Sequence, residues 1–180
     1  MNYNLISIKN NSIIKKNIEQ YYPYYDGCVV LYLSNLNNKH ICNFFYYNYK
    51  TNKKENIDKI YNYSIMSFIN FDKYIIFKAC DENNNIGIYY KKIGENVVES
   101  ICTESETYTV GGFNVYNSNV YVCTEDKIVL FDIISKNKEI ISNNGAKECY
   151  IVDKQYIYYI NFSNNLYRLD LKTKIAKKII

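Results

Sequence analysis

The sequence contains few of the residues that interrupt β-strands or carry common catalytic chemistry. Its 180 residues include one proline, six glycines, one histidine and no tryptophan. Because only proline lacks the backbone N–H that a sheet needs, a single proline leaves long stretches free to pair as strands. The one histidine, His40, is interpreted as a surface residue. No Ser/His/Asp set, zinc spacing or glycine-rich phosphate loop accompanies it, and no cofactor is expected.

The sequence also lacks the marks of export and of membrane insertion. Its first residues carry no basic start, and no apolar run approaches the ~18 residues that a membrane span needs. None of the six cysteines forms a Cys-x-x-Cys pair. We therefore expect a cytoplasmic protein whose cysteines are reduced and act as small apolar residues. They are Cys28, Cys42, Cys80, Cys102, Cys123 and Cys149.

The composition is that of a folded domain. Apolar residues make up 48% of the chain and charged residues 22%, and the length suits one domain over residues 1–180. The net charge of +4 is unevenly spread: residues 61–126 carry 4 basic and 9 acidic side chains, whereas residues 127–180 carry 10 and 5. The basic ends could attract an acidic partner or nucleic acid. The simpler interpretation is that the lysines and glutamates only keep the outer strands and turns in contact with water. Without an RNA-binding aromatic signature or a helix for a DNA groove, nucleic acid is not the expected partner.

The C-terminal stretch, residues 155–180, shows the local pattern most clearly. β-Branched and aromatic residues alternate over residues 156–161, which is typical of a pleated strand. Residues 163–165, Ser-Asn-Asn, form a predicted turn because Asn tolerates positive φ and bonds its own backbone. The alternation resumes over residues 166–171, and a second turn follows at residues 172–174. The stretch therefore predicts a strand, a tight turn and further strands.

Loose copies of this pattern recur along the chain. Five segments align, namely residues 5–18, 44–57, 88–101, 128–141 and 166–179. The first position is apolar in every copy, and the last is isoleucine, with spacings of 39, 44, 40 and 38 residues. The fifth position is polar in every copy, as Lys9, Asn48, Lys92, Asp132 and Asp170. A period near 40 with four short strands per unit is typical of a β-propeller blade.

The repeats resemble a known class of proteins. The pattern IYYIN followed by LYRLDL, within residues 157–171, resembles the Tyr-rich tandem repeats of bacterial β-propellers of unassigned function. These are distantly similar to propellers whose repeats carry a Tyr-Trp-Thr-Asp motif, although the chain has no tryptophan. A weaker resemblance to kelch repeats rests on Gly111 and Gly112, because the kelch pattern wants a glycine pair and a tryptophan in every blade. The resemblance implies an all-β propeller fold.

The expected architecture is about four and a half blades. Residues 1–18 would form a partial blade, and the full blades would be residues 19–60, 61–104, 105–142 and 143–180. Residues 1–18 would supply only the last two strands of a blade. The first two strands of that blade have no counterpart in the sequence. Three explanations stay open: a five-bladed ring with one reduced blade, an open arc that forms a homodimer or docks on a partner, and a piece of a larger propeller. The open arc would cover its strand edges by such pairing.

Four tyrosines near the start of the first full unit are the candidate binding residues: Tyr21, Tyr22, Tyr24 and Tyr25. On a loop at the mouth of a propeller they could stack on sugars or hold a peptide, since tyrosine combines area with a polar tip. The structural alternative is that the rings fill the space between blades.

A second cluster is acidic. Glu95, Glu99, Glu104 and Glu106 lie close in sequence, beside Cys102. Clustered carboxylates can bind a cation or transfer protons. These residues fall on a predicted turn and an outer strand, where glutamate is ordinary, so no metal site and no catalytic residue is assigned.

The function expected from the sequence is a non-catalytic protein-interaction or scaffolding module with a protein partner. The alternative is a propeller enzyme or lectin-like domain that binds a carbohydrate or peptide at the central depression. If two carboxylates and a cation site converged at one end of the central channel of the propeller, the enzyme hypothesis would be favoured. The polar residues that could converge there are Ser67, Lys78, Asn114 and Asp153.

Overall fold

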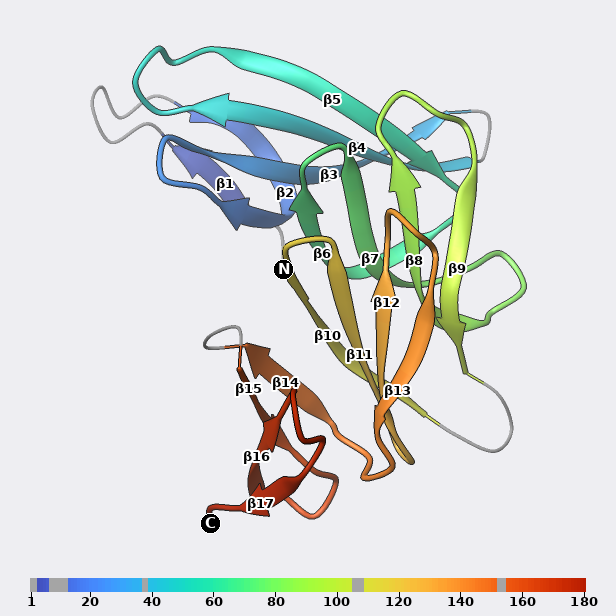
Figure 1. The fold of residues 1–180 in the computed structure, drawn as a ribbon. Coiled ribbons are helices and arrows are strands. Elements are labelled where there is room, and N and C mark those ends of the chain that lie inside the picture. Colours follow the sequence, from blue (N-terminus) through green and yellow to red (C-terminus); the bar gives the residue numbers. More distant parts are fainter. Residues whose placement is uncertain (1–2, 7–12, 37–38, 105–108, 152–154) are drawn as a thin grey trace. The chain divides into compact units, whose positions relative to one another are not determined.

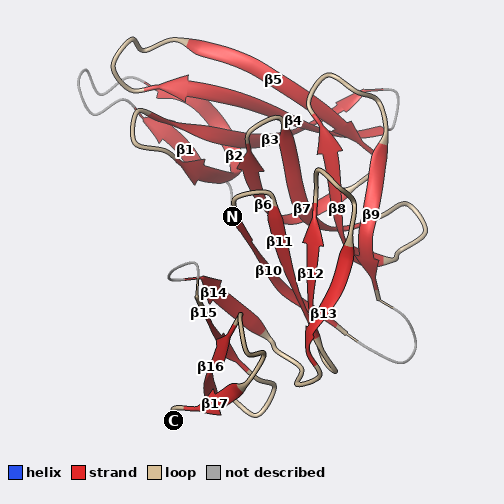
Figure 2. Ribbon diagram, viewed as in Figure 1, coloured by secondary structure: helices blue, strands red, loops and turns tan. Residues whose placement is uncertain are grey.

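The protein is all-β. The computed structural model describes residues 1–180 except 1–2, 7–12, 37–38, 105–108 and 152–154. The described residues form seventeen strands and no helix, and Figure 2 shows only strands joined by loops. Each strand pairs with its neighbour in sequence, which gives four separate sheets (Figure 1). The described part of the chain contains no apolar helix long enough to span a membrane.

The first sheet has five strands and the others have four, always in sequence order. The first sheet is β1 (Tyr3–Ile6), β2 (Ile13–Pro23), β3 (Gly27–Leu36), β4 (Lys39–Asn48) and β5 (Lys54–Tyr61). The second is β6 (Ser64–Phe71), β7 (Tyr74–Cys80), β8 (Ile86–Lys92) and β9 (Val98–Thr103). The third is β10 (Val110–Tyr116), β11 (Asn119–Thr124), β12 (Ile128–Asp132) and β13 (Lys138–Ser142). The fourth is β14 (Glu148–Ile151), β15 (Tyr156–Ile160), β16 (Leu166–Asp170) and β17 (Ala176–Lys178).

The start of the chain differs from the expected partial blade over residues 1–18. β2 does not end at Ile18 but continues to Pro23, and Ile18 pairs with Tyr3 on one side and Tyr32 on the other. A register shift between Ile18 and Gln20 marks an irregularity in the pairing of β2 with β3. The leading hairpin therefore adds a fifth strand to the first sheet. The remaining sheets lie within the expected ranges 61–104, 105–142 and 143–180.

The chain divides into two compact units, which are described separately. The first is Met1–Asn84 with Lys91–Val98, and the second is Asn85–Tyr90 with Glu99–Ile180. A single domain over residues 1–180 therefore stays a prediction.

In three of the five repeats the polar fifth position caps the turn that follows. Asn48, Asp132 and Asp170 each accept, through Oδ1, the N–H groups two and three residues further on, at 2.7 to 2.9 Å. The fourth residue after each of them has a positive φ and donates its N–H to the carbonyl of the capping residue. These residues are Asn52 (56°), Lys136 (59°) and Lys174 (58°). In these three repeats the polar residue is therefore a turn cap, whereas Lys92 pairs with Glu95 instead.

Each unit has its own apolar core. In the first unit one face of the first sheet buries a compact cluster, and Phe44 on the other face packs edge-on against Phe68 of β6 at 5.2 Å. That cluster is Ile18, Cys28, Val30, Phe45 and Tyr47. In the second unit the third and fourth sheets share a core of Tyr121, Cys123, Ile128, Ile141, Ala146, Cys149, Ile157, Tyr159 and Leu169.

All six cysteines are free, and five are buried while Cys80 is partly buried. The burial of five thiols agrees with the interpretation of the cysteines as small apolar residues. Burial raises the pKa of the Cys42 thiol to about 11, so this group is uncharged at neutral pH.

Candidate functional site

The four candidate tyrosines lie at one end of the first sheet, around the turn that joins β2 to β3. Tyr21 and Tyr22 belong to β2, whereas Tyr24 and Tyr25 belong to the turn itself. The turn is closed by a hydrogen bond from the Tyr24 N–H to the Gly27 carbonyl, at 2.8 Å. The cluster is therefore divided between a strand and a loop.

The turn is held against the end of β4 by two features of the backbone. The Tyr49 N–H donates to the Asp26 carbonyl at 2.8 Å. Gly27 leaves no room for a side chain, because a Cβ there would lie 2.2 Å from the Tyr47 carbonyl oxygen and 2.6 Å from the Tyr46 ring. The tyrosines are thus presented by a fixed backbone.

Two of the four tyrosines are packed within the first unit. The Tyr22 ring lies 6.4 Å from Phe68 and 5.4 Å from Tyr24, edge to face with the latter. The Tyr24 hydroxyl donates to the Asn70 carbonyl of β6 at 2.6 Å, and the Asn70 amide donates back to it at 3.1 Å. Tyr24 also meets Tyr46 edge-on at 6.4 Å. For Tyr22 and Tyr24, the geometry therefore fits the alternative interpretation, in which the rings fill space inside the fold.

The other two tyrosines face solvent. Tyr25 is 96% exposed and Tyr21 is 62% exposed, and Tyr49 beside them is 48% exposed. The Lys50 ammonium lies 5.7 Å from the centre of the Tyr25 ring. We call Tyr21, Tyr25 and Tyr49 the tyrosine surface. Tyr49, which follows the turn cap Asn48, was not predicted from the sequence. No sequence signal distinguishes it from the other 21 tyrosines.

The tyrosines next to the turn stay protonated near neutral pH. Burial raises the pKa of Tyr49 to about 12, and burial also raises the pKa of Tyr24. The pKa of Tyr46 is raised by burial and by the nearby carboxylate of Asp26. These hydroxyls therefore act as neutral hydrogen-bonding groups rather than as bases or nucleophiles.

The acidic cluster is not brought together. Each of its three described carboxylates has a partner of its own, and Glu106 lies outside the described residues. Among the residues that the structure describes, no three His, Cys, Asp or Glu side chains form a group that could hold a metal ion. The partners are Lys92 for Glu95, Lys136 for Glu99 at 2.8 Å, and the Val110 N–H for Glu104 at 3.1 Å.

His40 is exposed, as expected, and lies at the rim of a cavity of about 520 Å³ in the first unit. The cavity opens beside β3, the link between β5 and β6, and the β7–β8 turn. Its floor includes Leu31 and Ile65, and its carboxylates are Glu19, Asp81 and Glu82.

A cavity of about 510 Å³ occupies the corresponding place in the second unit. There the β11–β12 turn, the link between β13 and β14 and the β15–β16 turn meet. Sequence reasoning saw these segments only as turns. The signal it could have used is the polar run Asn143-Asn144-Gly145 combined with the polar turn at Asn161 and Ser163.

The polar residues expected to converge at a channel are only partly described. Ser67 and Lys78 are paired across β6 and β7. Asn114, in the second unit, donates its side-chain amide to the Cys149 carbonyl at 3.3 Å. Asp153 lies outside the described residues, so the convergence stays a prediction.

No protein-family model matches the chain, and no curated protein matches it. Solved structures do match it. An oligogalacturonate lyase from Vibrio parahaemolyticus is 14% identical with a TM-score of 0.64, and the match covers 93% of this chain and 56% of that one. An uncharacterised protein from Listeria monocytogenes is 14% identical with a TM-score of 0.58, with coverages of 91% and 53%. BamB from Moraxella catarrhalis is 8% identical with a TM-score of 0.53, with coverages of 97% and 70%.

The chain thus spans about half the length of the first two of these structures. The lyase and BamB are β-propeller proteins, and their likeness to this chain is one of fold. The match gives no sequence evidence for the Tyr-rich or Tyr-Trp-Thr-Asp families suggested by the repeats. Four-stranded antiparallel sheets in sequence order, together with these similarities, identify the fold as all-β and β-propeller-like.

Proposed function

We propose that this protein is a non-catalytic interaction module that binds a protein partner through the tyrosine surface. The observation that carries the proposal is the exposure of Tyr21, near the end of β2, and of Tyr25, on the following turn, whose backbone is held by hydrogen bonds. Tyrosine is enriched at protein interfaces because it supplies a large, stiff contact area and a hydrogen-bonding tip. The pairing of the Lys50 ammonium with the Tyr25 ring adds a cation at the edge of the surface.

The fixed backbone supports the proposal on energetic grounds. Binding orders side chains and loops, and this ordering weakens affinity. Here the turn is already held by the Tyr24–Gly27 and Tyr49–Asp26 hydrogen bonds and by the Tyr24 hydroxyl on Asn70. Only the exposed rings would need to be ordered on binding.

The name of the lyase suggests a different function, action on acidic oligosaccharides. The two cavities described above do not favour that substrate. Both are lined by carboxylates, and neither set of lining residues includes lysine or arginine. A galacturonate chain carries a carboxylate on every sugar, so like charges would face each other.

The cytoplasm is the compartment we propose for this function. Six free cysteines, five of them buried, suit a reducing compartment, where thiols are kept from pairing.

The test is affinity purification from the cells that make the protein, followed by quantitative mass spectrometry. The bait variant is Tyr21→Ser with Tyr25→Ser. The matched control is Tyr61→Ser, which changes another half-exposed tyrosine of the first sheet. We expect at least one protein to be recovered with wild type and with the control, and to fall more than about tenfold with the double variant.

Equal recovery of every protein with all three baits would contradict the proposal. Circular dichroism and thermal unfolding should show that the double variant keeps the wild-type fold, because both side chains are exposed.

A further inference from the structure

The cavity of the second unit has the dimensions and the lining of a small-ligand site. Its volume of about 510 Å³ falls within the usual range for such sites. Its walls come from three separate segments of the third and fourth sheets, so residues distant in sequence converge on it. Its lining includes Asp126, Asn143, Asn144, Asn161, Phe162 and Tyr167.

Two walls of the cavity are locked together by backbone contacts. Gly145 passes so close to the β11–β12 turn that a Cβ on it would lie 1.6 Å from the Glu125 carbonyl oxygen. The next residue, Ala146, donates its N–H to the Thr124 carbonyl at 2.9 Å. The link and the turn therefore hold one geometry, and the cavity is formed before any ligand binds.

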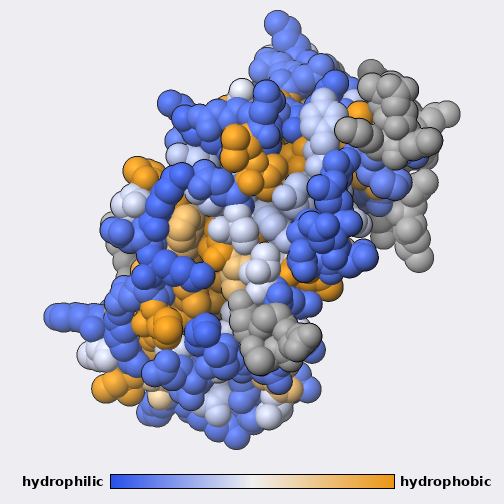
Figure 3. All heavy atoms as spheres, turned by 90° about the vertical axis from the view of Figure 1, so that its right-hand side faces the viewer, coloured by the Kyte–Doolittle hydropathy of each residue, from blue (hydrophilic) through white to orange (hydrophobic). Residues whose placement is uncertain are grey.

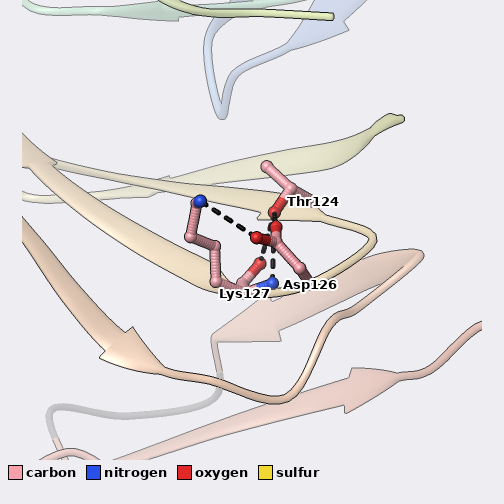
Figure 4. Close-up of polar contacts among 3 residues, drawn as sticks. All are labelled: Thr124, Asp126 and Lys127. Carbon is pink, nitrogen blue, oxygen red and sulfur yellow. Dashed lines mark hydrogen bonds and ion pairs between the residues drawn. The ribbon is translucent and has the colours of Figure 1, made fainter. Parts of the chain in front are cut away.

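The carboxylate of Asp126 is neutralised within the cavity wall (Figure 4). One oxygen accepts the Thr124 hydroxyl at 2.7 Å, and the other lies 3.0 Å from the Lys127 ammonium. The Thr124 hydrogen bond, followed by that of Lys127, lowers the pKa of Asp126, so the group is ionised and paired at neutral pH. The cavity consequently holds little unbalanced charge beyond that of Glu125.

Neutral hydrogen-bonding groups dominate the remaining polar lining. Asn143 and Asn144 are exposed on the link. The Asn161 Oδ1 already accepts the N–H groups of Ser163 and Asn165 at 3.1 and 2.9 Å, which leaves its Nδ2 group as a donor.

Below this polar rim lies the buried hydroxyl of Tyr159. Burial raises the pKa of Tyr159, and the polar side chains of Asn144 and Ser142 beside the hydroxyl act in the opposite direction. No hydrogen bond of regular geometry reaches this oxygen from the described residues, so it can still bind a water or a ligand group. Tyr159 is also one of the residues that line the cavity.

Aromatic rings form the rest of the wall. Tyr159 and Tyr167 are stacked with centroids 5.2 Å apart and an angle of 8° between their planes. Phe162, on the β15–β16 turn, is 43% exposed at the rim. Figure 3 shows a different view of the molecule, in which hydrophobic side chains lie in patches among hydrophilic ones.

We propose that this cavity is a binding site for a neutral oligosaccharide. The C–H face of a sugar ring packs on an exposed aromatic ring such as Phe162, and its hydroxyls exchange hydrogen bonds with the amides of Asn143, Asn144 and Asn161. The buried Tyr159 hydroxyl supplies a further partner directly or through a bound water. This site belongs to the second unit and does not depend on the tyrosine surface of the first.

The charge of the cavity selects against the two nearest alternatives. An acidic sugar would bring its carboxylates against Glu125 without a free lysine or arginine in the lining. A lysine-rich peptide would find one unpaired carboxylate at most, because the Lys127 ammonium already neutralises Asp126. The hydroxyls of a neutral sugar can hydrogen-bond to the asparagine amides of the cavity, and no charge on the ligand needs a partner.

The test is isothermal titration calorimetry of the full chain with three neutral probes, cellohexaose, maltohexaose and mannohexaose. A galacturonate hexamer and a tetralysine peptide are titrated alongside. The cavity variants are Phe162→Ala and Asn144→Ala. The matched control is Tyr150→Ala, which removes a half-exposed tyrosine of the same sheet that does not line the cavity. Thermal unfolding checks that each variant keeps the fold.

We expect at least one neutral hexamer to bind wild type and the control alike. Each cavity variant should weaken that binding about tenfold, since stacking and amide contacts are of that size. The proposal is overturned if no neutral hexamer binds at about 10 mM. It is also overturned if binding survives both cavity variants, or if the galacturonate hexamer or the tetralysine peptide binds more tightly than every neutral probe.

Discussion

At the scale of single residues, Gly27 decides how the tyrosine-bearing turn meets β4. A Cβ at this position would overlap the Tyr47 carbonyl and the Tyr46 ring. We predict that Gly27→Ala lowers the free energy of unfolding by about 2 kcal/mol, because the backbone of β3 must move away from β4. Urea unfolding followed by circular dichroism measures the change.

The matched control for this prediction is Gly112→Ala in β10. A Cβ there meets its nearest neighbour at an ordinary 3.5 Å, so the change should stay within about 0.5 kcal/mol. Equal losses for both variants would show that Gly27 is not required for close approach.

Ionisation of the buried thiol Cys42 predicts a loss of stability in alkali. Burial raises its pKa from 9.0 to about 11 in the folded protein. A raised pKa means that the folded state holds the proton more tightly, so this stabilisation is complete below pH 9.0 and disappears as the pH rises through about 11. The loss from this group would reach about 3 kcal/mol.

Comparison of wild type with Cys42→Val isolates this contribution. We expect the free energy of unfolding of the variant to fall less between pH 9 and 11 (the window set by the Cys42 pKa). Other titrating groups are present in both proteins and cancel. Parallel pH profiles would mean that the Cys42 thiol titrates alike in the folded and unfolded chains.

The candidate tyrosines show what could be predicted at this scale. The sequence singled out the cluster as a possible loop at the mouth of a propeller, and the structure divides it between the end of β2 and the turn that follows. It could not separate Tyr22 and Tyr24 from Tyr21 and Tyr25, because that division depends on Phe68 and Asn70 of another sheet. The cavity of the second unit was missed for the same reason, since its walls come from three turns.

At the scale of elements, the turn cap is the unit that the sequence repeats. Asp132 accepts two backbone N–H groups through Oδ1 and the Ser118 hydroxyl through Oδ2. We predict that Asp132→Ala destabilises the protein by about 1 to 2 kcal/mol, as loss of a comparable helix cap does. Asp132→Asn keeps the Oδ1 acceptor and should cost less. Thermal unfolding of the two variants ranks them, and an equal loss would contradict the role of Oδ1.

A buried ion pair links β5 to β8 within the first unit. The Lys91 ammonium contacts the Asp58 carboxylate, with side-chain exposures of 5% and 13%, and the Gly94 N–H donates to the same oxygen at 3.0 Å. We predict that Lys91→Met destabilises the unit by about 3 kcal/mol, because it leaves a buried carboxylate uncompensated.

The double variant Lys91→Met with Asp58→Asn tests the cause. Removing the charge as well should recover part of the stability, so the double variant should unfold later than Lys91→Met in urea. A further loss on adding Asp58→Asn would show that the carboxylate is satisfied without Lys91.

The element pattern was largely predictable, with one informative exception. Alternation and polar turns placed the strands of the last three sheets, and the fifth repeat position is a turn cap in three of the five repeats. The expected hairpin over residues 1–18 ended at Ile18, whereas β2 continues to Pro23 and lies between β1 and β3. Alternation of side chains continues along such a strand, so sequence periodicity does not mark where its pairing with β3 begins.

At the scale of the whole molecule, the same meander of strands recurs while the surface chemistry differs from place to place. The tyrosine surface belongs to the first sheet, and the amide-lined cavity belongs to the third and fourth. A repeated scaffold with varied turns is a common arrangement for recognition, because the sheets fix the backbone and the turns carry the contacts. Fold alone does not assign the function, which rests on these sites.

The most direct measurement of the central claim is photo-crosslinking in the cells that make the protein. A photoreactive phenylalanine analogue replaces Tyr25, which is 96% exposed, and in a second protein it replaces Tyr61, which is 50% exposed. We predict a discrete adduct with a partner protein from position 25 and a much weaker one from position 61. No adduct from position 25, or equal adducts from both positions, would contradict the assignment of the tyrosine surface as the recognition site.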